Sequence, residues 1–336
     1  MAVLYKVASL FAGVGGIELG FKQAGFNIVW ANEFDKKAQE TYNLNFNNYL
    51  DPNDIHEVQP QDLPEVDVLT AGFPCQAFSV AGYRKGFEDK RGNLFFEVLR
   101  LIKNRPPKVL FLENVKNLVG HDKGNTYKVI LEALKYHGYL VKDKVLNASE
   151  YGNVPQNRER IYIVAFQNKD EFERFVFPDP RPLNKKLSNV IDFNSKVDNS
   201  YYYTPEKNKF YDELEKNITN KDTVYQWRRV YVRENKSGLC PTLTANMGTG
   251  GHNVPLVYTD HGIRKLTPRE CFNLQGFPGD FQLPEDMAKS HLYKQAGNSV
   301  VVPVIKAIAS NIKIALDQKQ SKISSNQEVK QLELDI

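Results

Sequence analysis

The sequence is poor in cysteine, and it has no long hydrophobic run. Its three cysteines, Cys75, Cys240 and Cys271, are odd in number and far apart, which argues against a disulfide framework and is typical of a reducing compartment. No close cluster of histidine and cysteine indicates a metal site. Because no apolar stretch approaches the roughly 20 residues of a membrane helix, we expect a cytoplasmic protein with no membrane partner.

A strong charge of one sign is also absent, since the net charge is +4 for 336 residues. This balance permits a polyanionic partner without requiring one. Basic residues gather locally at 221–240, where five Lys or Arg stand against two Asp or Glu, interleaved with Tyr225, Trp227 and Tyr231. Such a mixture suits phosphates and bases, although a solvated basic strand has the same composition.

Short apolar runs alternate with helical patterns in the first half of the chain. This alternation predicts an α/β fold with a mostly parallel sheet covered by helices on both faces. In such sheets, ligands bind beyond the carboxyl ends of the strands, so we expect the functional motifs there. The predicted strands lie near 6–11, 27–32, 66–72, 108–114 and 161–166, and the predicted helices near 17–24, 35–43 and 94–103.

The texture of the sequence changes after the proline-rich stretch "FPDPRPLN" and becomes polar, aromatic and rich in asparagine. We therefore expect a first domain over 1–180 and a smaller, irregular, β-rich domain over 181–288. The range 289–317 contains a glycine–asparagine turn and an apolar-faced helix, which we expect to return to the first domain. A polar tail over 318–336 completes the chain.

A glycine-rich turn, "FAGVGG", stands between the first predicted strand and helix. Gly13, Gly15 and Gly16 have no Cβ, so backbone N–H groups can approach an anionic ligand at the helix N-terminus. A strict dinucleotide fingerprint requires Gly or Ala at position 18, but Glu18 stands there, which argues against NAD.

Acidic residues near the next strand ends favour a nucleoside. Glu33 follows "IVWAN", where a carboxylate can accept hydrogen bonds from ribose hydroxyls. Asp54 and Ile55 are placed for the exocyclic amine and face of adenine, just before another predicted strand. A glycine turn and these acids match S-adenosylmethionine, although each acid alone could be a solvated strand-end carboxylate.

Five further blocks follow in order: "GFPCQAF", "FLENVKNL", "YGNVPQNRERIYIVAF", "IRKLTPRECFNLQGFP" and "QAGNSVVVP". With the glycine turn, they resemble the DNA cytosine-5 methyltransferases of bacterial restriction–modification systems, from Ser9 to about Pro303. The resemblance implies a Rossmann-like, S-adenosylmethionine-dependent methyltransferase domain over 1–180. It also implies a target-recognition domain over 181–288.

The resemblance gives the catalytic roles. Cys75 is the expected nucleophile that attacks C6 of cytosine, because the ring must become an enamine before C5 can take a methyl group. Glu113 is expected to hydrogen-bond N3 and the 4-amino group of the base. Arg160 is expected to face O2 and to help hold Glu113, and Arg158 and Arg160 are the candidates for favouring the thiolate. Asn114 is expected to support the strand end.

The family's cofactor positions carry over to this chain, with Phe34 standing where many relatives have tryptophan. No metal is expected. The cofactor residues implied in this way are Phe11, Gly13, Gly15, Gly16, Glu33, Phe34, Asp54, Ile55, Pro74, Asn298 and Ser299.

The resemblance also implies that the target cytosine leaves the duplex, since the stack hides C5 and C6. A mobile loop is expected at 76–93 and a sequence-reading region at 226–255, where arginines could contact guanine in the major groove. Cys240 and Cys271 are expected to be packing residues. The residues implied to bind DNA are Ser79, Arg84, Lys85, Lys90, Arg91, Arg228, Arg229, Arg233, Thr242, Thr244 and Gly250.

Double-stranded DNA is the expected partner of a monomer, with a cognate restriction endonuclease in the same system. The tRNA-methylating branch of the same family is the nearest alternative, but it usually lacks so large a glycine-rich recognition region. A non-catalytic DNA-binding module is another alternative, against which the intact Cys75, Glu113, Arg158 and Arg160 argue.

Overall fold

A seven-stranded sheet forms the centre of the computed structural model, which describes residues 4–74, 94–228, 230–248 and 254–317. The strand order is β3-β2-β1-β4-β5-β8-β6. Pairs from β3 to β5 are parallel, and β8 is antiparallel to β5 and β6. The mostly parallel sheet is confirmed. The strands are β1 (Lys6–Leu10), β2 (Asn27–Asn32), β3 (Tyr49–Asp51), β4 (Val68–Ala71), β5 (Val109–Val115), β6 (Leu140–Asn147) and β8 (Glu159–Phe166).

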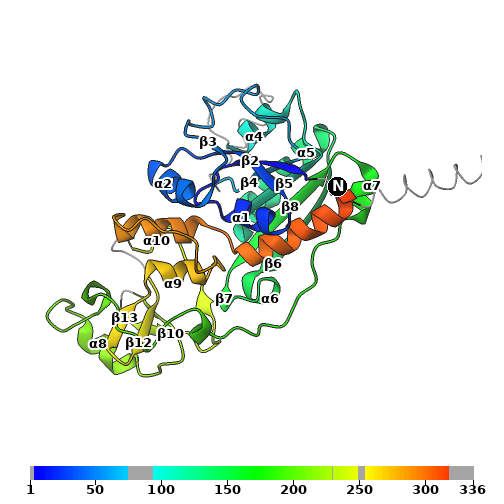
Figure 1. Ribbon diagram of the computed structural model, residues 1–336. Coiled ribbons are helices and arrows are strands. Elements are labelled where there is room, and N and C mark those ends of the chain that lie inside the picture. The colour runs from blue at the N-terminus through cyan, green and yellow to red at the C-terminus, as the bar shows by residue number, and fades with distance from the viewer. Residues whose placement is uncertain (1–3, 75–93, 229, 249–253, 318–336) are drawn as a thin grey trace, which may run out of the picture.

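Helices cover both faces of this sheet (Figure 1). Successive strand side chains point to opposite faces, so Val109 and Phe111 of β5 join one buried cluster while Leu110 and Leu112 join another. The first cluster includes α1 and the helix at 302–317, and the second includes α4 and α5. The helices in this half are α1 (Gly16–Gln23), α2 (Lys36–Asn45), α4 (Leu94–Ile102), α5 (Asn125–Tyr136), α6 (Ala148–Tyr151) and α7 (Lys169–Arg174).

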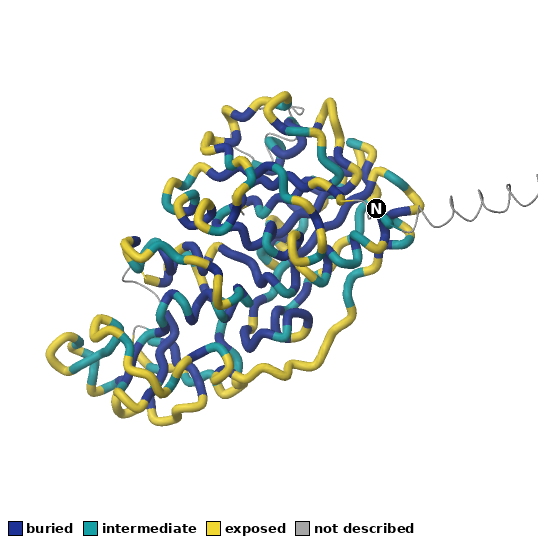
Figure 2. Tube along the Cα trace, in the orientation of Figure 1, coloured by how far each residue is buried: buried dark blue, intermediate teal, exposed yellow. Residues whose placement is uncertain are grey.

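A smaller antiparallel sheet, of order β10-β9-β12-β13, lies in the second part of the chain. An exposed stretch at 179–186 leads to it (Figure 2). A separate two-stranded sheet joins β7 to β11. The elements are β7 (Gln156–Asn157), α8 (Tyr211–Asn217), β9 (Tyr225–Trp227), β10 (Val232–Glu234), β11 (Cys240–Pro241), β12 (Leu256–Thr259), β13 (Gly262–Lys265), α9 (Pro268–Asn273) and α10 (Lys289–Asn298).

The two parts share a hydrophobic core. Tyr42 and Phe46, at the end of α2, belong to the same buried cluster as Phe272 of α9 and Tyr293 of α10. Cys240 and Cys271 are also buried in it. This cluster fixes α10 and the second part of the chain against the open end of the large sheet.

The C-terminal helical segment, Lys289–Asp317, is apolar enough by length and composition to cross a membrane, but 56% of the relevant window is buried in the protein. It is interrupted at 299–301, between α10 and the helix at 302–317. Ile305, Ile308 and Ile312 pack against the large sheet. Its apolar composition therefore serves the core.

Candidate active site

A cavity of about 460 Å³ opens at the carboxyl ends of β1, β2, β4 and β5. It lies at the point where the strand order reverses, because β1 has β2 as its neighbour on one side and β4 as its neighbour on the other. A cavity of this size suits a small-molecule ligand. The lining includes Phe11, Gly13, Val14, Gly16, Ile17, Glu33, Phe34, Asp35, Pro74, Glu113, Asn114, Arg158, Arg160, Lys294, Gln295, Gly297, Asn298 and Ser299.

The turn between β1 and α1 explains the glycines of the sequence. Phe11 and Gly13 both have positive φ values, 56° and 57°, and both line the cavity. Gly15, with φ of 88°, is outside the lining, and a Cβ there would overlap the ring of Phe46, with Cζ at 2.6 Å. At Gly16 a Cβ would come within 2.6 Å of Ser299 Oγ. Gly15 is therefore required by its positive φ and by its close packing against Phe46. The absence of a side chain at Gly16 lets Ser299, which follows α10, pack closely against it.

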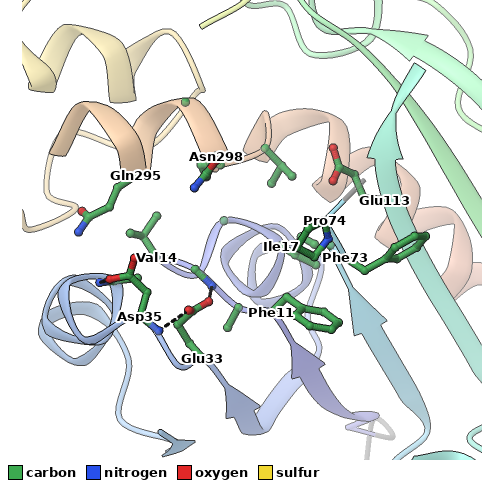
Figure 3. A pocket seen from close by; sticks show the side chains of 18 of the residues that line it. Phe11, Val14, Ile17, Glu33, Asp35, Phe73, Pro74, Glu113, Gln295 and Asn298 are labelled. Atoms are coloured by element: carbon green, nitrogen blue, oxygen red, sulfur yellow. Dashed lines mark hydrogen bonds between the residues drawn. The ribbon is translucent and has the colours of Figure 1, made fainter. Parts of the chain in front are cut away.

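Glu33 fixes the floor of the cavity at the end of β2 (Figure 3). Its Oε2 accepts from the Gly13 N–H and its Oε1 from the Asp35 N–H, each at 2.8 Å. Burial raises the pKa of Glu33, and these two backbone bonds act in the opposite direction. A carboxylate offers about four acceptor positions, so Glu33 can still accept hydroxyl groups of a ligand.

Phe34 leaves an aromatic ring uncovered beside Glu33. Its side chain is 64% exposed although it lines the cavity. Asp54 and Ile55 do not belong to the lining, and they follow β3 in a turn instead of preceding a strand. The Asp54 carboxylate accepts from the His56 N–H at 3.0 Å, and Ile55 is buried in the core. Their expected contact with adenine stays a prediction.

The side chains of α10 form the opposite wall, and the sequence reasoning missed several of them. Lys294 forms an ion pair of 2.7 Å with Asp35. Gln295 and Asn298 lie on α10 above Glu33 and Asp35 in Figure 3. Asp35 also caps α2, accepting from the N–H groups of two residues in its first turn. The position of Asp35 at the start of a helical pattern could have indicated its capping role from the sequence. No feature of the sequence indicated Lys294.

Glu113 lies at the other end of the cavity, near the end of β5 (Figure 3). The Nε of Arg160 on β8 is 3.1 Å from Glu113 Oε1, and the two side chains are only 13% and 11% exposed. Burial raises the pKa of Glu113, while the positive charge of Arg160 lowers it. Asn114 donates from Nδ2 to the Phe73 carbonyl at 2.8 Å, which ties the ends of β5 and β4 together.

Arg158 is buried although it lines the cavity. Its Nη1 donates to the Leu243 carbonyl at 2.8 Å, and its Nη2 donates to the carbonyls of Gly297, at 3.1 Å, and Ser299. Within the described part of the chain its Nε has no hydrogen-bond partner. Burial lowers the pKa of Arg158 to about 9. Its Nη1 and Nη2 therefore bind backbone carbonyls, and its Nε N–H has no partner among the described residues.

The residues expected to read DNA are spread over the second part of the chain. Arg228 donates to the Gln226 side chain at 2.9 Å, and Arg233 is exposed on β10. The Thr242 hydroxyl donates to the Asn157 carbonyl at 2.7 Å, and the Thr244 hydroxyl to Asn246 Oδ1 at 2.8 Å.

Several expected site residues lie outside the described residues, although Pro74, the chain neighbour of Cys75, lines the cavity. Among the described residues, no group of three or more His, Cys, Asp or Glu could hold a metal ion. The expected site residues outside the described ranges are Cys75, Ser79, Arg84, Lys85, Lys90, Arg91, Arg229 and Gly250.

Comparison with known proteins gives a family match along almost the whole chain. A family model described as C-5 cytosine-specific DNA methylase matches residues 5–314. The chain is 63% identical over 311 residues to the Type II methyltransferase M.Bsp6I of Bacillus sp. (strain RFL6), covering 92% of this chain and 98% of that protein. It is 40% identical over 327 residues to the Type II methyltransferase M.HhaI of Haemophilus parahaemolyticus, with coverages of 94% and 96%.

Solved structures share the same fold. A Spodoptera frugiperda DNMT2 mutant has a TM-score of 0.71 at 20% identity, covering 92% of this chain and 99% of that one. The S. pombe Dnmt2 methyltransferase has a TM-score of 0.68 at 19% identity, with coverages of 93% and 99%. Both likenesses confirm an α/β methyltransferase architecture with an added smaller sheet.

Proposed function

Because the chain belongs to the C-5 cytosine-specific DNA methylase family, we propose that its cavity binds S-adenosylmethionine and delivers the methyl group to C5 of a cytosine in a short duplex site. The observation that carries this proposal is the buried pair of Glu113 and Arg160, at the opposite end of the cavity from Glu33. One end thus suits a ribose, and the other suits a base.

The lining fits the cofactor by its chemistry. The Glu33 carboxylate is held by two backbone N–H groups and faces the cavity beside the uncovered ring of Phe34. These groups suit ribose hydroxyls and an adenine face. Asn298 and Ser299 would support the amino-acid end from the opposite wall. When bound, S-adenosylmethionine supplies an electrophilic methyl group on a sulfonium sulfur.

The proposed reaction begins at Cys75. Its thiolate adds to C6 of the cytosine, and the electron pair of the 5,6 double bond moves toward N3, where Glu113 shares its proton. A carboxyl group can do this only if its pKa is raised, and burial raises the pKa of Glu113. The enamine carbon C5 would then displace the methyl group from the sulfonium sulfur, which would keep the C–S electron pair and leave as the thioether of S-adenosylhomocysteine. Loss of the C5 proton to water or hydroxide and elimination of the Cys75 thiolate restore the aromatic ring.

The two arginines have different proposed parts. Arg160 orients Glu113 through its Nε, its Nη1 donates to the Glu159 carbonyl at 2.9 Å, and its Nη2 would face O2 of the base. Arg158 keeps its Nε N–H free within the described residues, and this donor would favour the Cys75 thiolate.

DNA binding involves more of the chain in this proposal. The target base leaves the stack and enters the Glu113 end of the cavity. The proposed base contacts come from Arg228, Arg229 and Arg233. The proposed contacts to the DNA backbone come from Ser79, Thr242, Thr244, Gly250 and the basic residues of 76–93. The Thr242 hydroxyl must turn from the Asn157 carbonyl to reach a phosphate.

The description of the matching family, C-5 cytosine-specific DNA methylase, favours DNA over tRNA as the substrate. M.Bsp6I and M.HhaI are Type II methyltransferases, so we propose a role in a restriction–modification system, alongside a cognate endonuclease. We also propose that the protein acts as a monomer in the cytoplasm.

Expression in a methylation-free bacterial host tests this function directly. Bisulfite sequencing of the host genome should reveal 5-methylcytosine at one short sequence in duplex DNA. A host expressing Cys75→Ser should show none. Unmethylated DNA in both hosts, despite soluble protein, would contradict the proposal, and transfer to tRNA in place of DNA would support the alternative branch.

A further inference from the structure

The segment at 240–245, which we name the recognition segment, runs along the chain that leads into β8. Cys240 and Pro241 pair in parallel with Gln156 and Asn157. The Cys240 N–H donates to the Pro155 carbonyl at 2.8 Å. The recognition segment is therefore anchored on the residues that precede β8, the strand that carries Arg160.

Two buried side chains fasten this segment further. The Leu243 N–H donates to Gln156 Oε1 at 3.2 Å, and the Leu243 carbonyl accepts from Arg158. Gln156 is fully buried, and its Nε2 donates to the Leu274 carbonyl at 2.6 Å. Gln156 therefore bridges the recognition segment and the residue that follows α9.

Gly297 completes the connection at the cofactor cavity. A Cβ on Gly297 would overlap the Thr244 carbonyl and would lie 2.5 Å from the Ala245 nitrogen. The neighbour that such a Cβ meets is backbone, which cannot swing aside as a flexible side chain does. Gly297 also lines the cavity beside Asn298 and Ser299, and its carbonyl accepts from Arg158.

We propose that Gly297 is a positioning residue through which the recognition segment shapes the cofactor cavity, so that duplex DNA and cofactor strengthen each other's binding. This inference rests on the proposed function, because it takes residues 240–245 as a DNA-contacting segment. DNA that holds Thr242 and Thr244 in place also holds the last turn of α10, where Asn298 and Ser299 face the cofactor. The strengthening is reciprocal, since coupling between two sites acts equally in both directions.

Calorimetry with S-adenosylhomocysteine, the demethylated product, measures the coupling without turnover. Its Kd is determined for the wild-type protein alone and with a saturating duplex that carries the site mapped in the host genome. We expect the duplex to tighten binding by about tenfold, within the usual range for coupled sites. In Gly297→Ala the tightening should fall below about threefold. Gly279→Ala is the matched control, because a Cβ on Gly279 meets nothing within 4 Å.

The results separate this inference from the function on which it rests. The coupling is overturned if the duplex tightens binding in Gly297→Ala as much as in the wild type. It is also overturned if the wild-type enzyme methylates the duplex but binds S-adenosylhomocysteine with the same Kd whether or not the duplex is present. A wild-type protein that methylates no duplex refutes the function instead. Melting temperatures check folding. If Gly297→Ala does not fold, the same titration is made with Gln156→Met, which removes the hydrogen bonds to Leu243 and Leu274 without adding bulk. If the duplex still tightens S-adenosylhomocysteine binding by the wild-type factor in this variant, the proposed connection between the recognition segment and the cavity is refuted.

Discussion

At the scale of single residues, two buried glutamates, Glu113 and Glu18, have different surroundings and therefore different roles. Glu113 is buried but paired with Arg160 at a cavity wall. Glu18 is fully buried in α1, and neither of its carboxyl oxygens has a hydrogen-bond partner among the described residues. Glu113 is thus placed to exchange a proton with a ligand, while Glu18 affects the stability of the fold.

Replacing Glu113 by glutamine should lower the rate of methyl transfer by roughly 10²- to 10⁴-fold, the usual contribution of a positioned acid. Cofactor affinity should change little, because Glu33 lies at the far end of the cavity. Single-turnover rates and calorimetry with S-adenosylhomocysteine measure the two effects. An equal loss of affinity and rate would argue against a role in the chemical step.

Glu18 should make the protein less stable as the pH rises. Burial raises its pKa from 4.5 to about 7, so between these values the folded chain holds a proton that the unfolded chain has lost. Stability from this group is therefore full below pH 4.5 and decreases as the pH rises toward 7. The non-ionising variant Glu18→Gln should exceed the wild type by roughly 3 kcal/mol in the free energy of unfolding at pH 8, and by little at pH 4.5.

Urea unfolding at the two pH values measures this difference. Glu285→Gln, at an exposed glutamate, is the control and should follow the wild type at both. An advantage of Glu18→Gln that stays constant from pH 4.5 to pH 8 would show that Glu18 does not hold a proton in the folded protein.

At the scale of elements, α9 depends on one buried ion pair. Glu270 accepts from Arg264 Nη1 and Nη2, at 2.8 and 2.7 Å, and from the Thr267 N–H at 2.8 Å, where it forms a capping box. Arg264, on β13, is fully buried. The pair therefore joins the smaller sheet to the helix that packs below α10.

Glu270→Gln should lower the free energy of unfolding by about 3 to 5 kcal/mol, because it leaves the buried charge of Arg264 without its partner. Urea unfolding beside Glu285→Gln measures the change. A loss below about 1 kcal/mol, the size of an exposed pair, would mean that solvent or another group compensates Arg264.

Most central elements could be predicted from the sequence, because β1, β2, β4, β5 and β8 are near-continuous apolar runs between turn signals. The edge strand β6, "LVKDKVLN", was not predicted, since an edge strand mixes charged and apolar residues. The helix α5 and the three-residue β3 were also missed. The antiparallel direction of β8 depends on long-range pairing that local patterns do not encode.

The site was predictable where it consists of strand ends. Glu33 follows β2 and Glu113 lies in the last residues of β5, and parallel strands bring such ends to one edge. Lys294 and Gly297 were not predicted, because they come from a helix far along the chain whose position depends on the shared core. Nor could the sequence show that Gly15 supports packing against Phe46 and that Arg158 binds backbone carbonyls.

At the scale of the whole molecule, the cavity lined by Glu33 and Glu113 lies where the large sheet meets the shared core. The smaller sheet carries an exposed arginine, Arg233. A duplex held by several such cations releases counterions when it binds. The affinity for DNA should therefore fall about 10³-fold between 50 and 200 mM salt, the loss typical of six phosphate contacts. Fluorescence anisotropy with a labelled duplex measures it, and a flat response would contradict extensive phosphate contact.

The proposed reaction requires a transient covalent bond between Cys75 and the target base. A duplex carrying 5-fluorocytosine at the mapped position should trap the protein when S-adenosylmethionine is present, because fluorine cannot leave C5 as a proton does. Denaturing electrophoresis and mass spectrometry should then show one protein–DNA adduct for the wild type and none for Cys75→Ser. Methylation of the ordinary duplex without any adduct on the fluorinated one would contradict the mechanism.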